Sequence, residues 1–205
     1  MEPLRRIVAI AAPLWREGVE TDQIIPARLC VRPAGADYGD TLFAPWRYRE
    51  DGGEDPEFVL NRGDYRRARI LVTGGNFGYG SSREHAAWAV RDFGIRAIVA
   101  PSFASIFAAN CIRNGVLPVG LRRDEVEEIV AELGDTPAEL VVDLERQVVE
   151  SPSSRTYGFE VAPLDRELLL EGVDAITLAA RHADEVAAFQ AADRVRRPWV
   201  YDPVS

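Results

Sequence analysis

Gly74-Gly75-Asn76-Phe77-Gly78-Tyr79-Gly80-Ser81-Ser82-Arg83-Glu84-His85-Ala86 is the stretch of this chain that decides its fold. It follows an apolar run of β type at 69–73 and opens an amphipathic run at 83–93, whose apolar spacing predicts a helix. The order is therefore strand, glycine-rich loop and helix N-terminus. The glycines of the loop supply positive φ angles or close backbone approach where a side chain would not fit.

The start of the predicted helix has the features of an anion receptor. Ser81 and Ser82 lie where the first N–H groups of a helix are unpaired and its dipole is positive. An anion at this point would meet backbone donors, two hydroxyls and the guanidinium of Arg83. The loop therefore predicts a carboxylate or phosphate site that contains a candidate nucleophile or base.

A purely structural interpretation fits the same residues. Ser81-x-x-Glu84 is a capping-box pattern, Arg83 fits a solvated first-turn residue, and His85 fits a packing histidine. Two nucleotide-binding motifs are excluded, because the G-x-G-x-x-G spacing is absent and the chain has no lysine for a P-loop.

Composition indicates an ordinary globular protein. With 205 residues, 47% of them hydrophobic and 28% charged, we expect a single domain over 1–205. No apolar run approaches the ~20 residues of a membrane span. The apolar stretch near the start of the chain is too short for a secretory signal. These two observations predict a cytoplasmic protein. A net charge of −9 argues against nucleic acid and anionic membranes as partners. Local arginines would have to attract an anionic substrate.

The two cysteines limit the metal chemistry of the chain. Cys30 and Cys111 are far apart and belong to no C-x-x-C or Cys/His cluster, so reduced thiols are expected, with a disulfide left open. Two cysteines are too few for an iron–sulfur cluster. If the chemistry needs one, another polypeptide must bring it.

Strand and helix patterns alternate in the central third, which predicts a parallel α/β arrangement. Gly94 fits the position after a helix C-terminus, and Ser102 fits a helix cap. After Gly134 the pattern predicts a hairpin and a third strand, then two helices and an aromatic tail at 195–205. The expected strands are 7–14, 69–73, 96–100, 116–119, 139–144, 147–150 and 156–161, and the expected helices are 83–93, 102–115, 123–133, 163–170 and 177–194.

Two segments before the glycine-rich loop lack long periodic elements. Thr21 and Asp22 precede Pro26, and on local pattern they fit an Asx or Ser/Thr turn. Residues 27–63 are rich in glycine, proline and aspartate, with aromatic residues between them. A segment of this length is usually functional or disordered. Its aromatics predict an ordered surface loop that docks on something.

Several motifs together resemble one known family. Residues 76–86 resemble the signature of the swivelling domain of the aconitase superfamily, and 21–26 resemble its T-D-x-I-I-P segment. Further matches lie at 42–48, 58–61, 100–110 and 115–119. Over nearly its whole length the chain is similar to the small subunits of bacterial 3-isopropylmalate dehydratases, of the long-form type.

The resemblance implies an aconitase-type swivelling β/β/α domain, with a central mixed or parallel sheet flanked by helices. It implies a large-subunit partner that carries a 4Fe-4S cluster, no metal or cofactor on this chain, and a small dicarboxylate substrate. Ser81 would be the catalytic base, and Ser82 and Arg83 would bind the substrate carboxylate. The other implied substrate-binding positions are Gly78, Tyr79, Gly80, Thr21, Asp22 and Arg32, and the supporting ones are Asn76, Glu84 and His85.

The chain departs from the family pattern at three places, and the altered loop among them concerns the identity of the substrate more than the type of reaction. Glu20 stands where the family usually has Asp, and Tyr79 where Cys is frequent, a change we expect to be tolerated because the chemistry requires no side chain there. The usual T-R-T-G-F-G portion is replaced by 34–39, so Arg32 is the nearest substitute for its arginine. The expected reaction is isomerisation of 2-isopropylmalate to 3-isopropylmalate in leucine biosynthesis. The alternatives are the same chemistry on another 2-substituted malate, such as 2-methylmalate or citraconate, and a non-catalytic anion-binding module.

Overall fold

The computed structural model describes residues 1–33, 35–81 and 83–201. The chain forms two compact units, Met1–Gly172 and Val173–Ser205, which we describe separately. The expectation of one domain over the whole chain stays a prediction. All of the residues discussed as a site belong to the first unit.

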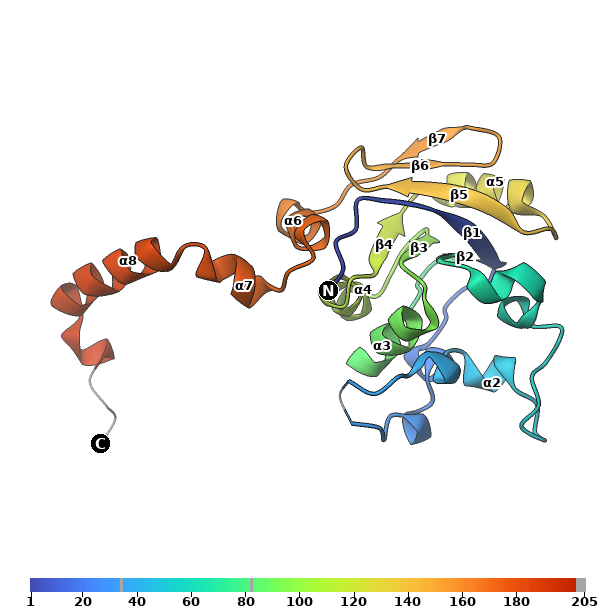
Figure 1. Cartoon of the computed structure of the whole chain (residues 1–205), viewed down its shortest axis with the longest axis horizontal. Helices are drawn as coiled ribbons and strands as arrows, with labels where there is room; N and C mark the ends of the chain where they lie inside the picture. The colour runs from blue at the N-terminus through green and yellow to red at the C-terminus, as the bar shows by residue number, and fades with distance from the viewer. Residues whose placement is uncertain (34, 82, 202–205) are drawn as a thin grey trace. The chain divides into compact units, whose positions relative to one another are not determined.

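A mixed seven-stranded sheet forms the centre of the first unit (Figure 1). Its order is β4-β3-β2-β1-β5-β6-β7, with β1 to β4 parallel and β5 to β7 antiparallel. This confirms the predicted α/β class with a mixed sheet. The strands are β1 (Arg6–Leu14), β2 (Ile70–Thr73), β3 (Ala97–Ala100), β4 (Leu117–Gly120), β5 (Ala138–Asp143), β6 (Val148–Glu150) and β7 (Thr156–Gly158).

Helices cover both faces of the parallel half of the sheet, which explains why β2 and β3 read as continuous apolar runs. Leu71 and Ile98 pack into one core with α3 and α4, whereas Ile70 and Val72 pack into a second core with α5. All four side chains are fully buried. The helices of this unit are α1 (Thr21–Ile24), α2 (Ala44–Arg47), α3 (Glu84–Phe93), α4 (Ser105–Arg113), α5 (Arg123–Leu133) and α6 (Pro163–Glu171).

The carboxyl ends of β1, β2 and β3 lie at one edge of the sheet because these strands are parallel. The loops that follow them are hydrogen-bonded to one another. The Gly18 N–H donates to the Gly75 carbonyl at 2.9 Å, and the Phe77 N–H donates to the Ser102 carbonyl at 3.1 Å. The glycine-rich loop therefore lies between the loops after β1 and β3.

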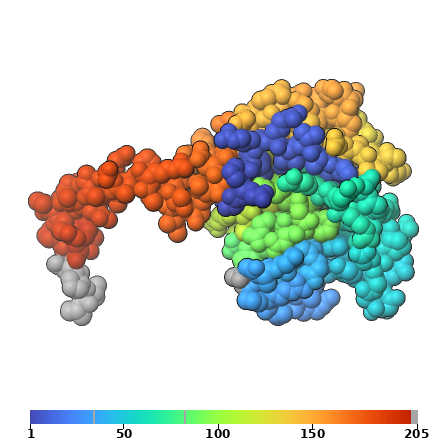
Figure 2. All heavy atoms as spheres, viewed as in Figure 1, coloured from blue at the N-terminus to red at the C-terminus, as the bar shows by residue number. Residues whose placement is uncertain are grey.

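Residues 27–63 hold short helical turns rather than long elements. They are η1 (Ala27–Leu29), η2 (Gly39–Thr41), α2 and η3 (Val59–Asn61), and η4 (Gly63–Arg67) follows them. Tyr38, Phe43 and Phe58 are buried in the core that contains α3. These aromatics thus pack against another part of the same chain. In the space-filling view, residues 27–63 (blue to cyan) lie against the green segment that contains α3 (Figure 2).

Two predictions about helix boundaries were wrong. Ser102 does not cap α4, which begins at Ser105 with Ala104 at its N-cap; the Ser102 hydroxyl oxygen instead accepts from the Asn76 N–H at 2.8 Å. In the second unit the expected helix 177–194 is two helices, α7 (Ala175–Ala180) and α8 (Ala183–Arg196), followed by η5 (Pro198–Val200). They are separate because the N–H groups of Arg181 and His182 bond three residues back, as in a turn.

Residues 202–205 of the expected tail lie outside the described part of the chain. Across the ranges that are described, no helix combines the length and the apolar character needed to cross a membrane.

Candidate functional site

Two glycines of the loop adopt conformations that other residues resist. Gly78 has φ +79° and Gly80 has φ +93°. A Cβ on Gly78 would lie 2.2 Å from Cγ of Phe107, whereas one on Gly80 would meet nothing closer than 3.7 Å. Gly78 is therefore required by packing as well as by backbone angle, and Gly80 by backbone angle alone. At the start of the loop, a Cβ on Gly74 would lie 2.6 Å from the Arg16 carbonyl oxygen.

The helix after the loop starts later than the sequence suggests. α3 begins at Glu84 with Arg83 as its N-cap, so Ser81 lies outside the first turn. The Ser81-x-x-Glu84 capping box is a wrong interpretation, because Glu84 instead accepts from the Asn114 side-chain amide at 3.0 Å. Ser82 lies outside the described residues.

The T-D segment and the glycine-rich loop meet at Ser81. The N–H of Thr21 donates to the Tyr79 carbonyl at 2.9 Å, and its hydroxyl donates to the Ser81 carbonyl at 3.1 Å. Thr21 is buried and Ser81 is exposed. In the described chain no hydrogen bond occupies the Ser81 hydroxyl. The Asx or Ser/Thr turn is a wrong interpretation of this segment, which forms the short helix α1.

Arg83 carries the positive charge beside Ser81 and is paired. Its Nη2 lies 3.2 Å from Oδ1 of Asp22, and both side chains are partly exposed. The thiol of Cys30 lies in the same environment. Burial raises the pKa of Cys30, while the charge and hydrogen bond of Arg83 lower it to a smaller extent. The residues brought together here are thus Thr21, Asp22, Ser81 and Arg83, with Cys30 as a neighbour that sequence reasoning missed.

Arg32 is held in a different contact. Its guanidinium forms a two-pronged ion pair with Asp40, with nitrogen–oxygen distances of 2.6 and 2.7 Å. This contact holds the pKa of Asp40 below its usual range. Arg32 also lines a hollow of about 570 Å³ with Arg28 and Tyr48. No described contact links it to Ser81 or Arg83.

The Tyr79 side chain has a partner, which sequence reasoning missed. Its hydroxyl donates to Oε1 of Glu20 at 2.5 Å. That hydrogen bond, with burial as a smaller cause, raises the pKa of Tyr79. Because the two residues are far apart in the sequence, only their spatial pairing reveals the contact.

Two other expected supporting residues, His85 and Asn76, have structural roles. The ring of His85 packs against Trp88 and Tyr38, with centroids 4.6 and 5.4 Å apart. Asn76 has a positive φ of 53°, which asparagine tolerates better than most residues. The contacts of His85 with Trp88 and Tyr38 agree with its interpretation as a packing histidine.

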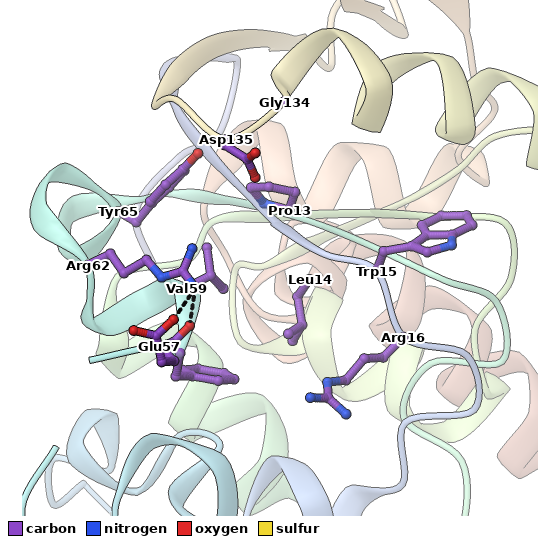
Figure 3. A pocket seen from close by; sticks show the side chains of 11 residues that line it. Pro13, Leu14, Trp15, Arg16, Glu57, Val59, Arg62, Tyr65, Gly134 and Asp135 are labelled. Atoms are coloured by element: carbon purple, nitrogen blue, oxygen red, sulfur yellow. Dashed lines mark hydrogen bonds and ion pairs between the residues drawn. The ribbon is translucent and has the colours of Figure 1, made fainter. Parts of the chain in front are cut away.

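A pocket of about 350 Å³ lies beside the carboxyl end of β1, and none of the expected site residues lines it (Figure 3). It is lined by residues at the end of β1, among them Trp15 and Arg16, and by Arg62, Tyr65 and Asp135. Arg62 is paired there with Glu57. With acidic and basic side chains both present, the pocket shows no preference for an anion.

The cysteines do not fit an iron–sulfur cluster. Cys111 is fully buried in α4, where burial raises its pKa, and Cys30 is half-buried near Arg83. Over the described ranges, no three His, Cys, Asp or Glu side chains are grouped so that they could hold a metal ion. We therefore derive no reaction step through a cluster on this chain.

Two protein-family models match the chain. The aconitase C-terminal domain model matches residues 1–124, and the LeuD_N model matches 127–163. The chain is 47% identical to the 3-isopropylmalate dehydratase small subunit of Cupriavidus necator, over 98% of this chain and 99% of that protein. It is 44% identical to that of Paramagnetospirillum magneticum, over 98% and 100%.

A solved structure, the 3-isopropylmalate dehydratase of Methanocaldococcus jannaschii, is similar with a TM-score of 0.66 and 27% identity, over 89% of this chain and 99% of that one. The motifs, the mixed sheet and these similarities lead to one assignment. The chain belongs to the 3-isopropylmalate dehydratase small-subunit family, whose members carry the aconitase C-terminal domain.

Proposed function

We propose that this chain is the small subunit of a two-subunit hydro-lyase that isomerises 2-isopropylmalate to 3-isopropylmalate through 2-isopropylmaleate, in leucine biosynthesis. One observation carries the proposal. Two motifs about sixty residues apart converge at one place, where Thr21 contacts Ser81 and Asp22 contacts Arg83. That place combines the exposed Ser81 with the guanidinium of Arg83.

The reaction has two difficult parts, and this chain supplies one of them. Removing a proton α to a carboxylate requires a base, together with positive charge where negative charge develops. Ser81 is exposed and its backbone is held by Thr21, so its hydroxyl suits the role of base. Arg83 and Ser82 would bind the carboxylate, and backbone groups of 78–80 would line the site.

Arg83 would exchange partners when the substrate binds. In the structure its guanidinium is paired with Asp22 at 3.2 Å, a partly exposed contact of small net energy. A substrate carboxylate would share or replace that contact. Asp22 thus keeps Arg83 oriented towards the site between turnovers.

The second difficult part, expulsion of hydroxide, requires a Lewis acid. The two cysteines of this chain do not fit a cluster, so we assign the Lewis acid to a 4Fe-4S cluster on a large-subunit partner. The names of the relatives support a partner, since they are small subunits.

The same chemistry on another 2-substituted malate is the second candidate. The observation that favours it is the Arg32–Asp40 ion pair. Arg32 is the nearest substitute for the family's loop arginine, and its guanidinium is already bound to Asp40 instead of being available to a substrate. A methyl- or larger-substituted diacid would then be selected by different loop contacts.

The test is anaerobic reconstitution with the large subunit of the same genome, followed by assays with 2-isopropylmalate, 2-methylmalate and citraconate. We expect activity with 2-isopropylmalate, and none from this chain alone. Activity restricted to another diacid would retain the mechanism and change the substrate. A formed complex with an intact cluster that accepts no diacid would refute the hydro-lyase and favour an anion-binding module.

A further inference from the structure

We infer that Glu20 and Tyr79 form a positioning pair that fixes the backbone of Ser81, and that the pair acts through one hydrogen bond. This inference rests on the proposed function of Ser81. Neither side chain needs to touch substrate for the role. The inference also replaces the expectation that the Tyr79 side chain has no function.

The first support is the position of the pair between the two motifs. The Tyr79 hydroxyl donates to Oε1 of Glu20 at 2.5 Å. Their backbones form a parallel bridge, and the Thr21 N–H donates to the Tyr79 carbonyl at 2.9 Å. The next contact along both segments is the one from the Thr21 hydroxyl to the Ser81 carbonyl, at 3.1 Å. The side-chain bond is therefore one residue from Thr21 and two from Ser81.

The second support is the freedom of the backbone that the pair restrains. Gly80 separates Tyr79 from Ser81, has φ +93° and is exposed. Glycine at this position gives little intrinsic stiffness to the segment. Hydrogen bonds on both sides of Gly80, at Tyr79 and at Ser81, therefore restrain the position of the Ser81 hydroxyl. This restraint matters because small displacements of a reacting group lower the reaction rate.

The third support is that both partners of the hydrogen bond are held by neighbouring groups. Gly18 has φ +58°, and a Cβ at this residue would lie 3.5 Å from Cε1 of Tyr79. Because this is an ordinary van der Waals distance, the tyrosine ring lies close to the loop that follows β1. The glutamate is fixed at its own backbone, where its N–H donates to the Gln23 side chain at 2.9 Å. Both ends of the bond are thus anchored.

The experiment is a double-mutant cycle in the reconstituted two-subunit enzyme. The variants are Tyr79→Phe, Glu20→Ala and the two combined, with Glu20→Gln as a conservative control that keeps an acceptor oxygen. We expect each of the first two variants to lower kcat about tenfold with little change in KM, as for loss of a hydrogen bond to a charged acceptor. The combined variant should lose no more than either single one, and Glu20→Gln should recover most of the rate.

A second readout does not depend on activity. Amide hydrogen exchange at 78–81 should accelerate in Tyr79→Phe and Glu20→Ala, and remain near wild type in Glu20→Gln. An inactive wild type with accelerated exchange in the variants would count against the proposed reaction but retain the pair. Unchanged exchange, losses in kcat that multiply in the combined variant, or a fall in melting temperature with unchanged kcat would overturn the pair.

Discussion

Gly78→Ala tests whether packing against Phe107, in addition to the backbone angle, requires glycine at this position of the loop. The new methyl group would lie 2.2, 2.5 and 2.7 Å from Cγ, Cδ1 and Cβ of Phe107, which is fully buried in α4. These distances are all below the limit for real contacts, so the loop or the helix must shift. The matched control is Gly80→Ala, where φ is similarly positive and the new methyl group would meet only ordinary van der Waals contacts, the nearest at 3.7 Å.

The expected magnitudes follow from two separate costs. A non-glycine residue at positive φ costs about 1–2 kcal/mol, and forcing an extra methyl group into a packed core costs about 1–3 kcal/mol. Gly80→Ala carries the first cost alone. Gly78→Ala carries both, so its free energy of unfolding should fall by about 2–5 kcal/mol.

The assay is urea unfolding of the two variants and wild type, with the midpoint and slope of each curve compared. Adding Phe107→Ala gives a further control, because alanine lacks the Cγ and Cδ1 atoms that make the two shortest contacts. The loss in the double variant should therefore be less than the sum of the single losses. Equal destabilisation by Gly78→Ala and Gly80→Ala, or strictly additive losses with Phe107→Ala, would refute the reasoning.

Three further predictions concern other parts of the first unit. Arg47→Met should lower the free energy of unfolding by about 2–4 kcal/mol in a denaturation curve, because Arg47 is buried and donates to Asn61 and to a backbone carbonyl; a loss below 1 kcal/mol would contradict it. The hydrogen bond from Arg123 lowers the pKa of Glu17. The stability that this pair adds should therefore be complete above about pH 4.5 and be lost as the pH falls through the lower pKa of the folded state. A Glu17→Gln variant whose loss of thermal stability is the same from pH 7 to pH 3 would contradict this prediction. Iodoacetamide at pH 8 should modify Cys30 slowly and Cys111 only after unfolding, because burial raises the pKa of both thiols. Mass spectrometry of the labelled native protein measures this, and rapid labelling of Cys111 would contradict the prediction.

The parallel half of the sheet was predictable because its strands are buried on both faces. The apolar runs that became β2 and β3 are short and bounded by turns, and the α5 prediction agrees with the observed Arg123–Leu133. Gly94 ends α3 in the left-handed conformation, as the sequence indicated. Burial on two sides leaves a strong local pattern in the sequence.

Other features depend on contacts that local patterns do not contain. Residues 27–63 are held by side-chain bonds such as the one from Arg47 to Asn61 at 3.1 Å, and by aromatics that enter the core under α3. The capping patterns at Ser81 and Ser102 failed because Glu84 and Ser102 found partners in other elements. Polar residues near a helix start have several possible partners, and tertiary structure chooses between them.

The sequence predicts the two motifs of the candidate site. The local pattern of neither motif predicts that the two are in contact. The resemblance placed Thr21 and Asp22 beside the glycine-rich loop, and the structure brings them to Ser81 and Arg83. The Glu20–Tyr79 bond joins two positions that sequence reasoning treated as independent departures. Only the register between the two loops shows that they belong together.

The most direct test of the account is the rate of 2-isopropylmalate isomerisation by reconstituted complexes that carry Ser81→Ala. Ser153→Ala is the matched control, an exposed serine whose hydroxyl donates to Glu132 in another part of the first unit. With complex formation and cluster content shown to be intact, we predict that Ser81→Ala lowers kcat by about 10²–10⁴-fold, as for loss of a general base, and that Ser153→Ala does not. A Ser81→Ala complex that retains kcat within a factor of ten of wild type would contradict the role of Ser81 as the base.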